Sequence, residues 1–487
     1  MSSVLYGVLL VPLITAGAVL MPASSRGVKV VNIIGSAVSS LLLGFIIYLI
    51  NTSGYLRLGA LYADHLSSLF LTVIAVLSFT ASLFSASYME KELITEKQDL
   101  KALKRYYFLF NIFCLTMISV LIVENLGLMW VAVEATTLAS ALLVAFYFNR
   151  AAIEAAWKYV MVCTVGICLA LLGTILLYYA QLSAGLGGDA LSWLVLKENG
   201  ALLDERMIKL AFVFIIIGYG TKVGLAPMHT WLPDAHSQAP SPVSGLLSGA
   251  LLSCAIYVIM RNIAIVKASA GFEFVQQLLM ALGLFSILIA IPFLLVQHDV
   301  KRLLAYSSVE HMGIITFALG IGTPLSVYGA LLHIFNHAIA KSALFYMAGV
   351  LTREYRTKQI LRIKGLVKAK PALGAILLVL VLIITGSPPF GVFFSKFIIT
   401  WAAFAAGFKL AGGVFLILVA AVFAGMLYYC CQMLFGQPAG SVQQVSIGKP
   451  AMAAMVLSVA IVAVTGLYVP DFFNNALRLA AAIVIGG

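Results

Sequence analysis

Long, almost uninterrupted runs of apolar residues follow one another along the whole chain. Fourteen runs approach or exceed the roughly 20 residues with which a helix crosses the hydrocarbon core of a bilayer. A transmembrane barrel would instead show strands of about 10 residues with alternating polarity. The pattern therefore predicts an all-α polytopic membrane protein with about 14 transmembrane helices. The runs lie at 3–21, 30–50, 65–87, 106–123, 126–148, 156–180, 208–228, 241–265, 274–296, 303–322, 325–351, 372–407, 410–435 and 449–469.

Proline interrupts two of these runs at membrane depth. Lys222 is followed by Pro227 in the stretch KVGLAPMHTWLPDAH, and Pro388 and Pro389 precede Lys396 in the long twelfth run. Proline removes a helix hydrogen bond, and free backbone at this depth is tolerated only inside protein or beside water. Broken helices at matching places in two halves of a chain are typical of inverted-repeat transporters. The sequence therefore predicts two discontinuous helices within two inverted five-helix repeats.

The two predicted repeats divide the chain into four regions. The first and last regions hold the spans outside the repeats, and each region between them holds five spans. The regions are 1–104 (spans 1–3 and a cytoplasmic connection), 105–265 (spans 4–8), 266–436 (spans 9–13) and 437–487 (span 14 and a tail).

The composition supports a membrane protein and excludes other classes. Apolar residues make up 62% of the chain and charged residues 10%, and the mean hydropathy is +1.07. Soluble domains carry about 25% charged residues, so a water-soluble enzyme and a disordered chain are both excluded. The six cysteines lie in apolar runs without a C-x-x-C pair, and no glycine-rich phosphate-binding pattern follows a strand-like run. We therefore expect no metal, iron–sulfur or nucleotide cofactor in this chain.

The basic residues indicate orientation. The net charge is +12, but Lys and Arg are scattered among the loops, so nucleic acid is not expected as a partner. Cytoplasmic connections of membrane proteins are enriched in Lys and Arg. If both termini lie outside, 19 basic residues fall in cytoplasmic connections and 8 on the outer side. The bias predicts that the N and C termini lie on the outer, periplasmic side.

Four ionisable residues remain in the middle of predicted spans. Glu134 lies eight residues into its run, and Lys222, Lys341 and Lys396 are the three basic residues that no loop contains. An ionisable group at bilayer depth costs at least about 2.5–3.5 kcal/mol on insertion scales. A buried Glu–Lys bridge that only holds helices together would explain one such residue. Four at matched depth favour a relay of protonatable sites across the membrane midplane.

Histidines extend this candidate relay. His333, His337 and Lys341 are spaced four residues apart, so a helix places them on one face. Imidazole has an ordinary pKa of about 6.5 and therefore exchanges protons near neutral pH. We do not expect a metal site on the two histidines, because no third histidine or carboxylate is apparent beside them.

The eighth span offers hydroxyl groups in place of a titratable side chain. Its stretch SPVSGLLSGALLSCAIYVIM has Ser248 and Ser253 as polar candidates. A hydroxyl both donates and accepts, so we expect these serines to border a hydrated cavity that links Lys222 to His333. Secondary candidates elsewhere in the same region are His229, Asp234 and His311.

A family resemblance rests on five stretches: MWVAVEATTLASALLVAFY, TKVGLAPMHTWLPDAHSQAPSPVSGLLSG, LLAYSSVEHMGI, HIFNHAIAKSALFYMAGVL and PPFGVFFSKF. They resemble the antiporter-like proton-pumping subunits of respiratory complex I and of multisubunit cation/proton antiporters. The likeness extends over roughly residues 100 to 400. WVAVEATTLAS and WLPDAHSQAPSPVS most resemble the component F subunit of group 4 membrane-bound hydrogenases, the hydrogenase-4 and formate hydrogenlyase type.

The resemblance implies fourteen spans, outer termini and roles for the residues named above. It implies that Glu134 is the acid paired with Lys222 and that Lys396 is the terminal lysine of a second half-channel. The histidines and the lysine of the eleventh span would form the central relay between them. Many members of the family carry Lys or His midway along the eighth span, where this chain has serine, so the link between the two halves departs from the family pattern.

These expectations describe a proton-translocating subunit of a redox-driven complex in the inner membrane of a prokaryote. The complex would be an oxidoreductase of the NADH dehydrogenase or hydrogenase type, and this chain would hold no redox centre. Its partners would be other membrane subunits, the lipid bilayer and a peripheral catalytic arm. Iron–sulfur clusters and a nickel–iron centre or flavin would lie in those partner subunits.

Two alternatives remain open on the sequence. A Na⁺/H⁺ antiporter subunit would use the same scaffold, but sodium needs clustered oxygen ligands, and the available acids Asp234 and Glu310 are expected near span ends. A scaffold subunit whose relay has degenerated would be consistent with Ser253 in the eighth span.

Overall fold

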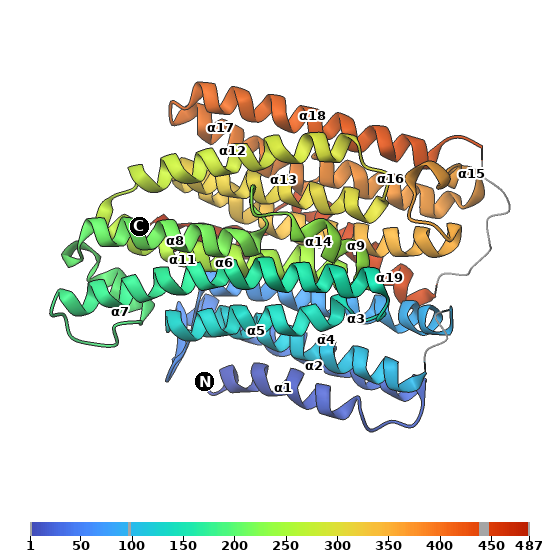
Figure 1. Cartoon of the computed structure of the whole chain (residues 1–487), viewed down its shortest axis with the longest axis horizontal. Helices are drawn as coiled ribbons and strands as arrows, with labels where there is room; N and C mark the ends of the chain where they lie inside the picture. The colour runs from blue at the N-terminus through green and yellow to red at the C-terminus, as the bar shows by residue number, and fades with distance from the viewer. Residues whose placement is uncertain (1, 96–98, 438–447, 486–487) are drawn as a thin grey trace.

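The long helices of the protein lie side by side along one common axis (Figure 1). The computed structural model describes residues 2–95, 99–437 and 448–485. Within them, eleven helices are long and apolar enough to cross a membrane, and three shorter apolar helices accompany these. The structure therefore confirms the all-α membrane fold. The shorter apolar helices are the first helix and the two halves of one broken span.

The helices and strands run in the following order. They are α1 Val4–Ala18, α2 Ser25–Ser53, β1 Tyr55–Leu58, β2 Leu61–Asp64, α3 His65–Thr95, α4 Leu100–Ile122, α5 Leu126–Val144, α6 Arg150–Ser183, α7 Trp193–Glu198, η1 Gly200–Leu202, α8 Glu205–Val223, α9 Trp231–Gln238, α10 Ser241–Leu246, η2 Leu247–Leu251, α11 Leu252–Ala270, α12 Glu273–Leu295, α13 Val300–Ile321, α14 Pro324–Tyr355, η3 Ile360–Arg362, α15 Leu366–Ala369, α16 Pro371–Thr385, α17 Gly391–Ala405, α18 Lys409–Leu434, α19 Lys449–Leu467 and α20 Asp471–Ile485.

Three elements were not part of the predicted pattern. The hairpin of β1 and β2 joins α2 to α3, with Leu58 opposite Leu61 at its turn. The short helix α7 lies in the polar insert before α8. Helix α20 occupies the segment predicted as a tail, and its apolar face packs against α3, α14 and α11.

Both predicted breaks occur, and they share one local geometry. Gly224 directly follows α8 and Gly386 directly follows α16, and both glycines have a positive φ, 81° and 87°. At each break, the amide of the residue after the glycine donates to the carbonyl five residues earlier. At the first break, Leu225 donates to the Gly220 carbonyl at 2.9 Å. The equivalent bond at the second break runs from Ser387 to Leu382, also at 2.9 Å. Glycine adopts this left-handed end without steric cost.

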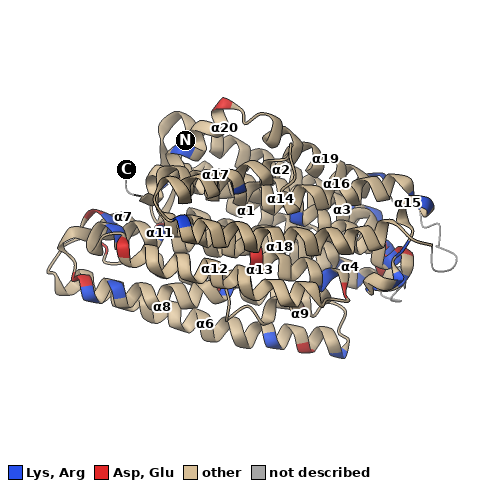
Figure 2. Cartoon of the chain, turned by 90° about the horizontal axis from the view of Figure 1, so that it is seen from above, with Lys and Arg blue, Asp and Glu red and all other residues tan. Residues whose placement is uncertain are grey.

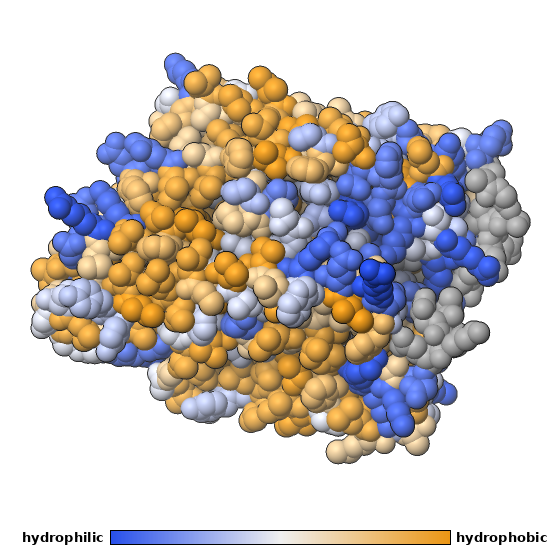
Figure 3. Space-filling model, viewed as in Figure 1, coloured by the Kyte–Doolittle hydropathy of each residue, from blue (hydrophilic) through white to orange (hydrophobic). Residues whose placement is uncertain are grey.

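Most charged residues lie toward the two ends of the bundle. Figure 2 shows most Lys, Arg, Asp and Glu toward its ends, and Figure 3 shows a broad hydrophobic surface bordered by polar residues. We call the end that carries Arg150 and the loop from Arg353 to Lys370 the basic face. Helix α1 begins and α20 ends at the other end, the opposite face (Figure 1), which also carries the hairpin.

A buried ion pair fixes the hairpin to the eighth span. The Arg261 guanidinium donates to both carboxylate oxygens of Asp64 at 2.6 Å and lies 4.3 Å from the centre of the Trp193 ring. Ser67 accepts a further bond from the same group at 3.0 Å. Burial favours the neutral carboxyl, but the adjacent guanidinium and its hydrogen bonds outweigh burial and lower the pKa of Asp64. The pair therefore ties β2 and α3 to α11.

Arg261→Ala should strongly destabilise the fold, because it leaves the Asp64 carboxylate buried without a counter-charge. Removing one partner of a buried pair costs about 3–5 kcal/mol. Thermal unfolding in detergent, followed by the loss of helical circular dichroism, measures the effect. Lys209→Ala is the control, since Lys209 pairs with Glu205 at the surface, and it should leave the transition unchanged. Equal transitions for both variants would contradict this role of the pair.

Candidate functional site

The first cluster surrounds Lys222, which is fully buried at the end of α8. Its ammonium donates to the Thr137 hydroxyl at 2.8 Å and to the Tyr159 hydroxyl at 2.7 Å. Thr137 in turn donates to one carboxylate oxygen of Glu134 at 3.0 Å. Thr164 donates to the other oxygen at 3.2 Å. Two helices, α5 and α6, thus supply every partner in this chain of bonds.

Glu134 and Lys222 are therefore joined through a hydroxyl and form no direct ion pair among the described residues. Glu134 and Thr137 lie three residues apart on α5, so they share one helix face. Glu134 is partly exposed at the side of the bundle, whereas Thr137 and Lys222 are buried. The distance between the acid and the lysine is bridged by Thr137, which accepts from the ammonium and donates to the carboxylate.

The second cluster brings three imidazoles together between α13, α14 and α17. His311 and His333 share a hydrogen bond of 2.9 Å between Nδ1 and Nε2. The other ring nitrogen of His333 bonds the Ser395 hydroxyl at 2.8 Å. The ring of His337 lies 4.7 Å from that of His311, and neither of its nitrogens has a hydrogen-bond partner among the described residues. A hydrogen bond between His337 and His311 would therefore require a small movement of one ring or a bridging water molecule.

The prediction that the histidines lack a third imidazole nearby is wrong. His311 comes from α13 and lies against both histidines of α14, which sequence distance concealed. The rings are stacked or tilted against one another rather than aimed at one point. Among the described residues, no group of three or more His, Cys, Asp or Glu side chains is placed to hold a metal ion.

Lys396 ends this cluster at the second helix break. Its ammonium lies 3.3 Å from a Glu310 carboxylate oxygen and donates to the Thr385 carbonyl at 3.2 Å. Thr385 is the last residue of α16, so the break frees this carbonyl from the helix ladder. The placement of Glu310 near a span end was wrong: it is the eleventh residue of the 22-residue helix α13 and is fully buried.

Lys341 is held by backbone between the two clusters. Its ammonium donates to the Leu304 carbonyl at 2.7 Å, and the Ser308 hydroxyl donates to the same oxygen at 3.1 Å. Ser308 also shares a hydrogen bond of 2.8 Å with Ser248 in the eighth span. A π-helical turn, η2, carries Ser248 at this point. One of the two predicted serines thus reaches the lysine through hydroxyl and carbonyl groups.

Ser253 does not take part in this link in the described structure. Its hydroxyl donates to the Gly249 carbonyl of its own helix at 2.6 Å and is buried. Back-bonding to the preceding turn is the usual arrangement for a serine inside a helix. The Ser253 hydroxyl is therefore hydrogen-bonded to the backbone of its own helix.

His236 is a residue that the sequence pattern did not single out. It is fully buried on α9, and neither ring nitrogen has a hydrogen-bond partner among the described residues. Its ring lies 6.3 Å from that of Trp231, which packs on Tyr159 at 4.6 Å in the first cluster. On α14, the ring of Phe345, four residues after Lys341, lies 5.4 Å from the same imidazole. His236 therefore lies between the two clusters.

The secondary candidates near α9 lie toward the basic face. Asp234 pairs with Lys158 at 3.4 Å and Arg302 at 3.3 Å. Lys358 donates to the Ser237 carbonyl at 2.8 Å, and burial lowers the pKa of this lysine. The ring of His229 lies in the break, 6.1 Å from the ring of Phe293, and among the described residues no hydrogen bond joins its side chain to either cluster. Asp234 on α9 and His229 just before that helix thus lie apart from the central groups.

Comparison with known proteins places this arrangement in a family. Residues 123–427 match the family described as NADH:quinone oxidoreductase/Mrp antiporter, TM. Residues 55–96 match the family described as NADH-Ubiquinone oxidoreductase (complex I), chain 5 N-terminus. The first match covers more than half of the chain. The chain belongs to this family.

The antiporter-like subunit has relatives in several membrane complexes. A hydrogenase-4 component F homolog from Methylacidiphilum infernorum (isolate V4) is 39% identical over 409 residues, 84% of this chain and 85% of that protein. In the structure of the membrane-bound sulfane sulfur reductase, an archaeal respiratory membrane complex, one chain has a TM-score of 0.88 at 25% identity, covering 99% and 98% of the two chains. A chain of the Mrp complex from Dietzia sp. DQ12-45-1b shares the fold, with a TM-score of 0.84 at 19% identity and 99% and 97% coverage.

These comparisons establish what kind of protein this is. It is a multi-pass, antiporter-like membrane subunit of the complex I and hydrogenase-4 type, and its buried charged residues fit a relay. The structures that it resembles are subunits of multi-subunit membrane complexes.

Glu310→Gln should impair proton translocation as severely as Lys396→Ala. The amide keeps the shape of the carboxylate but removes the buried counter-charge of Lys396, and losing one partner of a buried pair costs about 3–5 kcal/mol. Acidification measured with a pH-sensitive dye in proteoliposomes gives the rate. Glu273→Gln, an exposed acid in the first turn of α12, is the matched control and should pump normally. A fully active Glu310→Gln variant would remove the acid from the pathway.

Proposed function

We propose that this antiporter-like subunit translocates protons within a redox-driven membrane complex, through a relay of buried side chains at the bilayer midplane. The observation that carries the proposal is the pair of hydrogen-bonded clusters around Lys222 and Lys396, each beside a helix break. Ionisable groups at this depth are costly, and a chain that contains several linked ones has a use for their charge. The relay comprises Glu134, Lys222, His333, His337, Lys341 and Lys396, to which the geometry adds Glu310, His311 and His236.

The first step concerns the charge on Lys222. Two neutral hydroxyls hold its ammonium, and the carboxylate of Glu134 acts on it through Thr137. When Glu134 moves away or is neutralised, the ammonium loses counter-charge in a low-dielectric site and releases its proton more readily. Moving one charge through 100 mV costs about 2.3 kcal/mol. A tenfold change in proton affinity is worth about 1.4 kcal/mol, so a change of roughly a hundredfold drives one such step.

Two routes can carry a proton from Lys222 to Lys341. One runs through the imidazole of His236, whose two nitrogens are free to bind and release protons. The other uses Ser248 and Ser308, which order a hydrogen-bonded link up to the Leu304 carbonyl beside Lys341. The serine link orients water and holds no charge itself. His236 supplies the titratable group that the eighth span lacks.

The second half carries the proton from Lys341 to Lys396. His337, four residues before Lys341 in the sequence, lies on the same face of α14, and its ring packs against that of His311. The bond from His311 to His333 continues to Ser395, the residue before Lys396. The Glu310 carboxylate lies beside the ammonium of Lys396 and supplies a counter-charge to it. The cluster therefore passes protons along imidazoles and stores a positive charge at its end.

Partner subunits would supply the energy. Glu134 is partly exposed on α5, on a side where Val131, Leu138 and Leu142 are each more than half exposed. An ionisable group is poorly suited to face lipid tails, so this side fits a neighbouring membrane subunit. A peripheral arm carrying iron–sulfur clusters and a nickel–iron centre or flavin would perform the electron transfer. The more basic face would lie in the cytoplasm of a prokaryote and the termini on the periplasmic side of its inner membrane.

The contacts of Glu310 argue for protons rather than sodium as the translocated ion. A sodium site needs several oxygen ligands around one position, whereas Glu310 is paired with a lysine ammonium and Asp234 with Lys158 and Arg302. Each acid is already matched to a cation. Proton exchange between lysine, histidine and carboxylate uses these contacts as they stand.

Lys222→Ala and Glu134→Gln should each nearly abolish proton translocation while the complex still assembles. The first removes the central protonatable group of its cluster, and the second removes the charge that controls it. Dye-reported acidification by proteoliposomes in sodium-free medium measures translocation, and native electrophoresis measures assembly.

Glu154→Gln provides the control for these variants, because Glu154 is an exposed acid on α6 and pairs with Lys158 at the surface. Its pumping rate should match that of the unmodified complex. Normal pumping by Lys222→Ala would exclude the relay proposed here. A strict requirement for sodium in the unmodified complex would replace the proton by sodium as the coupling ion.

Ser248→Ala should slow translocation, whereas Ser253→Ala should not. The first variant breaks the hydrogen bond to Ser308 that reaches the Lys341 site, and the second removes only a bond within one helix. The two changes delete the same atom from the same span, so each controls for the other. Initial rates of acidification give the comparison. Equal rates for both variants would leave His236 as the route between the halves.

A further inference from the structure

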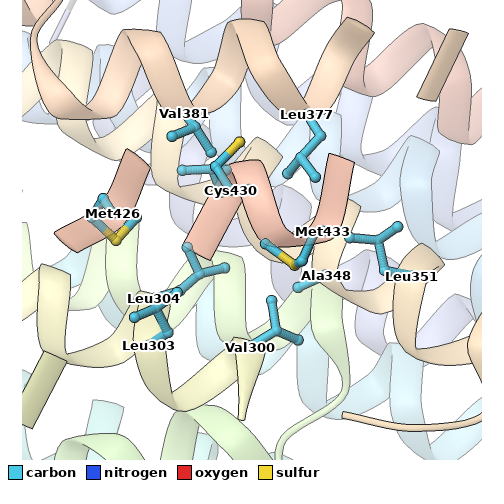
Figure 4. Close-up of a pocket in the computed structure, with 11 residues that line it drawn as sticks. Val300, Leu303, Leu304, Ala348, Leu351, Leu377, Val381, Met426, Cys430 and Met433 are labelled. Atoms are coloured by element: carbon cyan, nitrogen blue, oxygen red, sulfur yellow. The ribbon is translucent and has the colours of Figure 1, made fainter. Parts of the chain in front are cut away.

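An apolar cavity lies beside Lys341, on its basic-face side. Helices α13, α14, α16 and α18 enclose it, and Figure 4 shows their side chains directed toward the shared space. Leu304, whose carbonyl holds the Lys341 ammonium, lines the cavity with its side chain. Leu344 and Ala348 follow Lys341 by about one and two turns of α14 and line it as well. The cavity therefore adjoins a member of the relay.

The lining keeps water out in the arrangement seen here. All lining side chains are aliphatic or contain sulfur, and the cavity has a volume of about 20 Å³. One water molecule fits a space of this size, but it needs two to four polar partners to stay. The Leu304 carbonyl already accepts from Lys341 and Ser308. A proton needs a chain of water or polar groups, so the cavity interrupts any path through it.

Charged groups lie at the basic-face end of the same helices. Glu354 lies three residues beyond Leu351, a lining residue, and is buried on α14. It pairs with Lys370, which directly precedes α16. One Glu354 oxygen has no hydrogen-bond partner among the described residues. Polar groups thus bound the dry cavity on both sides: Glu354 and Lys370 toward the basic face, and Lys341 toward the membrane centre.

We propose that this cavity is a hydrophobic gate, closed in this structure, on a second proton route that joins the basic face to Lys341. The proposal rests on the proposed function, because it requires Lys341 to take up protons. Apolar constrictions open by wetting when their walls separate slightly. An outward shift of α16 or α18 would admit several waters and connect Glu354 with Lys341. The closed gate prevents protons from leaking past Lys341 between cycles.

A native cysteine makes the gate measurable. Cys430 lines the cavity from α18 and is buried. Its thiol must meet water to ionise, and only the thiolate reacts with a charged methanethiosulfonate. The experiment uses the assembled complex in proteoliposomes, with Cys168 and Cys431 replaced by serine. We expect slow labelling of Cys430 at rest and labelling about tenfold faster during electron-transfer turnover. The same background with Cys430→Ser gives the blank.

Two wall variants separate wetting from general loosening. Val381→Thr replaces a methyl group by a hydroxyl on the cavity wall, and it should speed the labelling of Cys430 at rest and raise the passive proton leak without turnover. Val379→Thr makes the same change on α16 at a residue that does not line the cavity, and it should do neither. Ala348→Val, which fills the space, should suppress turnover-dependent labelling.

Labelling of Cys430 that is equally slow at rest and during turnover would overturn the gate, and so would equal leaks for Val381→Thr and Val379→Thr. These results would leave the relay intact, since they do not depend on whether Lys222→Ala pumps. Conversely, a pumping Lys222→Ala variant would reject the relay even if Cys430 responded to turnover. Faster labelling together with the leak of Val381→Thr supports the gate.

Discussion

A positive charge buried in a low-dielectric interior must find its partners inside the protein, and this requirement organises the whole molecule. Lys222, Lys341 and Lys396 meet it in three different ways, with hydroxyls, with a backbone carbonyl and with a carboxylate. The helix break after α16 contributes directly, because it frees the Thr385 carbonyl that Lys396 uses. The break in this helix thus helps to stabilise a buried ammonium in addition to shaping the topology.

Lys222 and Lys396 differ in the groups that hold their ammonium ions. Lys222 has neutral hydroxyl partners, and one of them, Thr137, links it to the Glu134 carboxylate. Lys396 is in direct contact with the Glu310 carboxylate. In the proposed relay, a proton would therefore pass from a lysine held by hydroxyls to a lysine held by a carboxylate.

The sequence predicted the fold far better than the contacts within the site. Apolar runs and prolines located the spans and both breaks, because lipid imposes length and hydropathy directly on the chain. Glu310 was misplaced although it lies seven residues into its run, about as deep as Glu134 in its own. His236 gave no periodic signal, since its position depends on how the short helix α9 packs between two clusters. The hydroxyl bridge at Thr137 likewise required the packing of α5 against α8 and α6.

The ion pair between Asp64 and Arg261 gives the eighth span unequal ends. Its opposite-face half is pinned to the hairpin by two short bonds, while its other half winds into the π-turn η2 at Ser248. A π-turn inside an α-helix is rare and is often found at functional sites. The span is therefore anchored by an ion pair in one half, and its other half carries the irregular turn at which Ser248 meets Ser308.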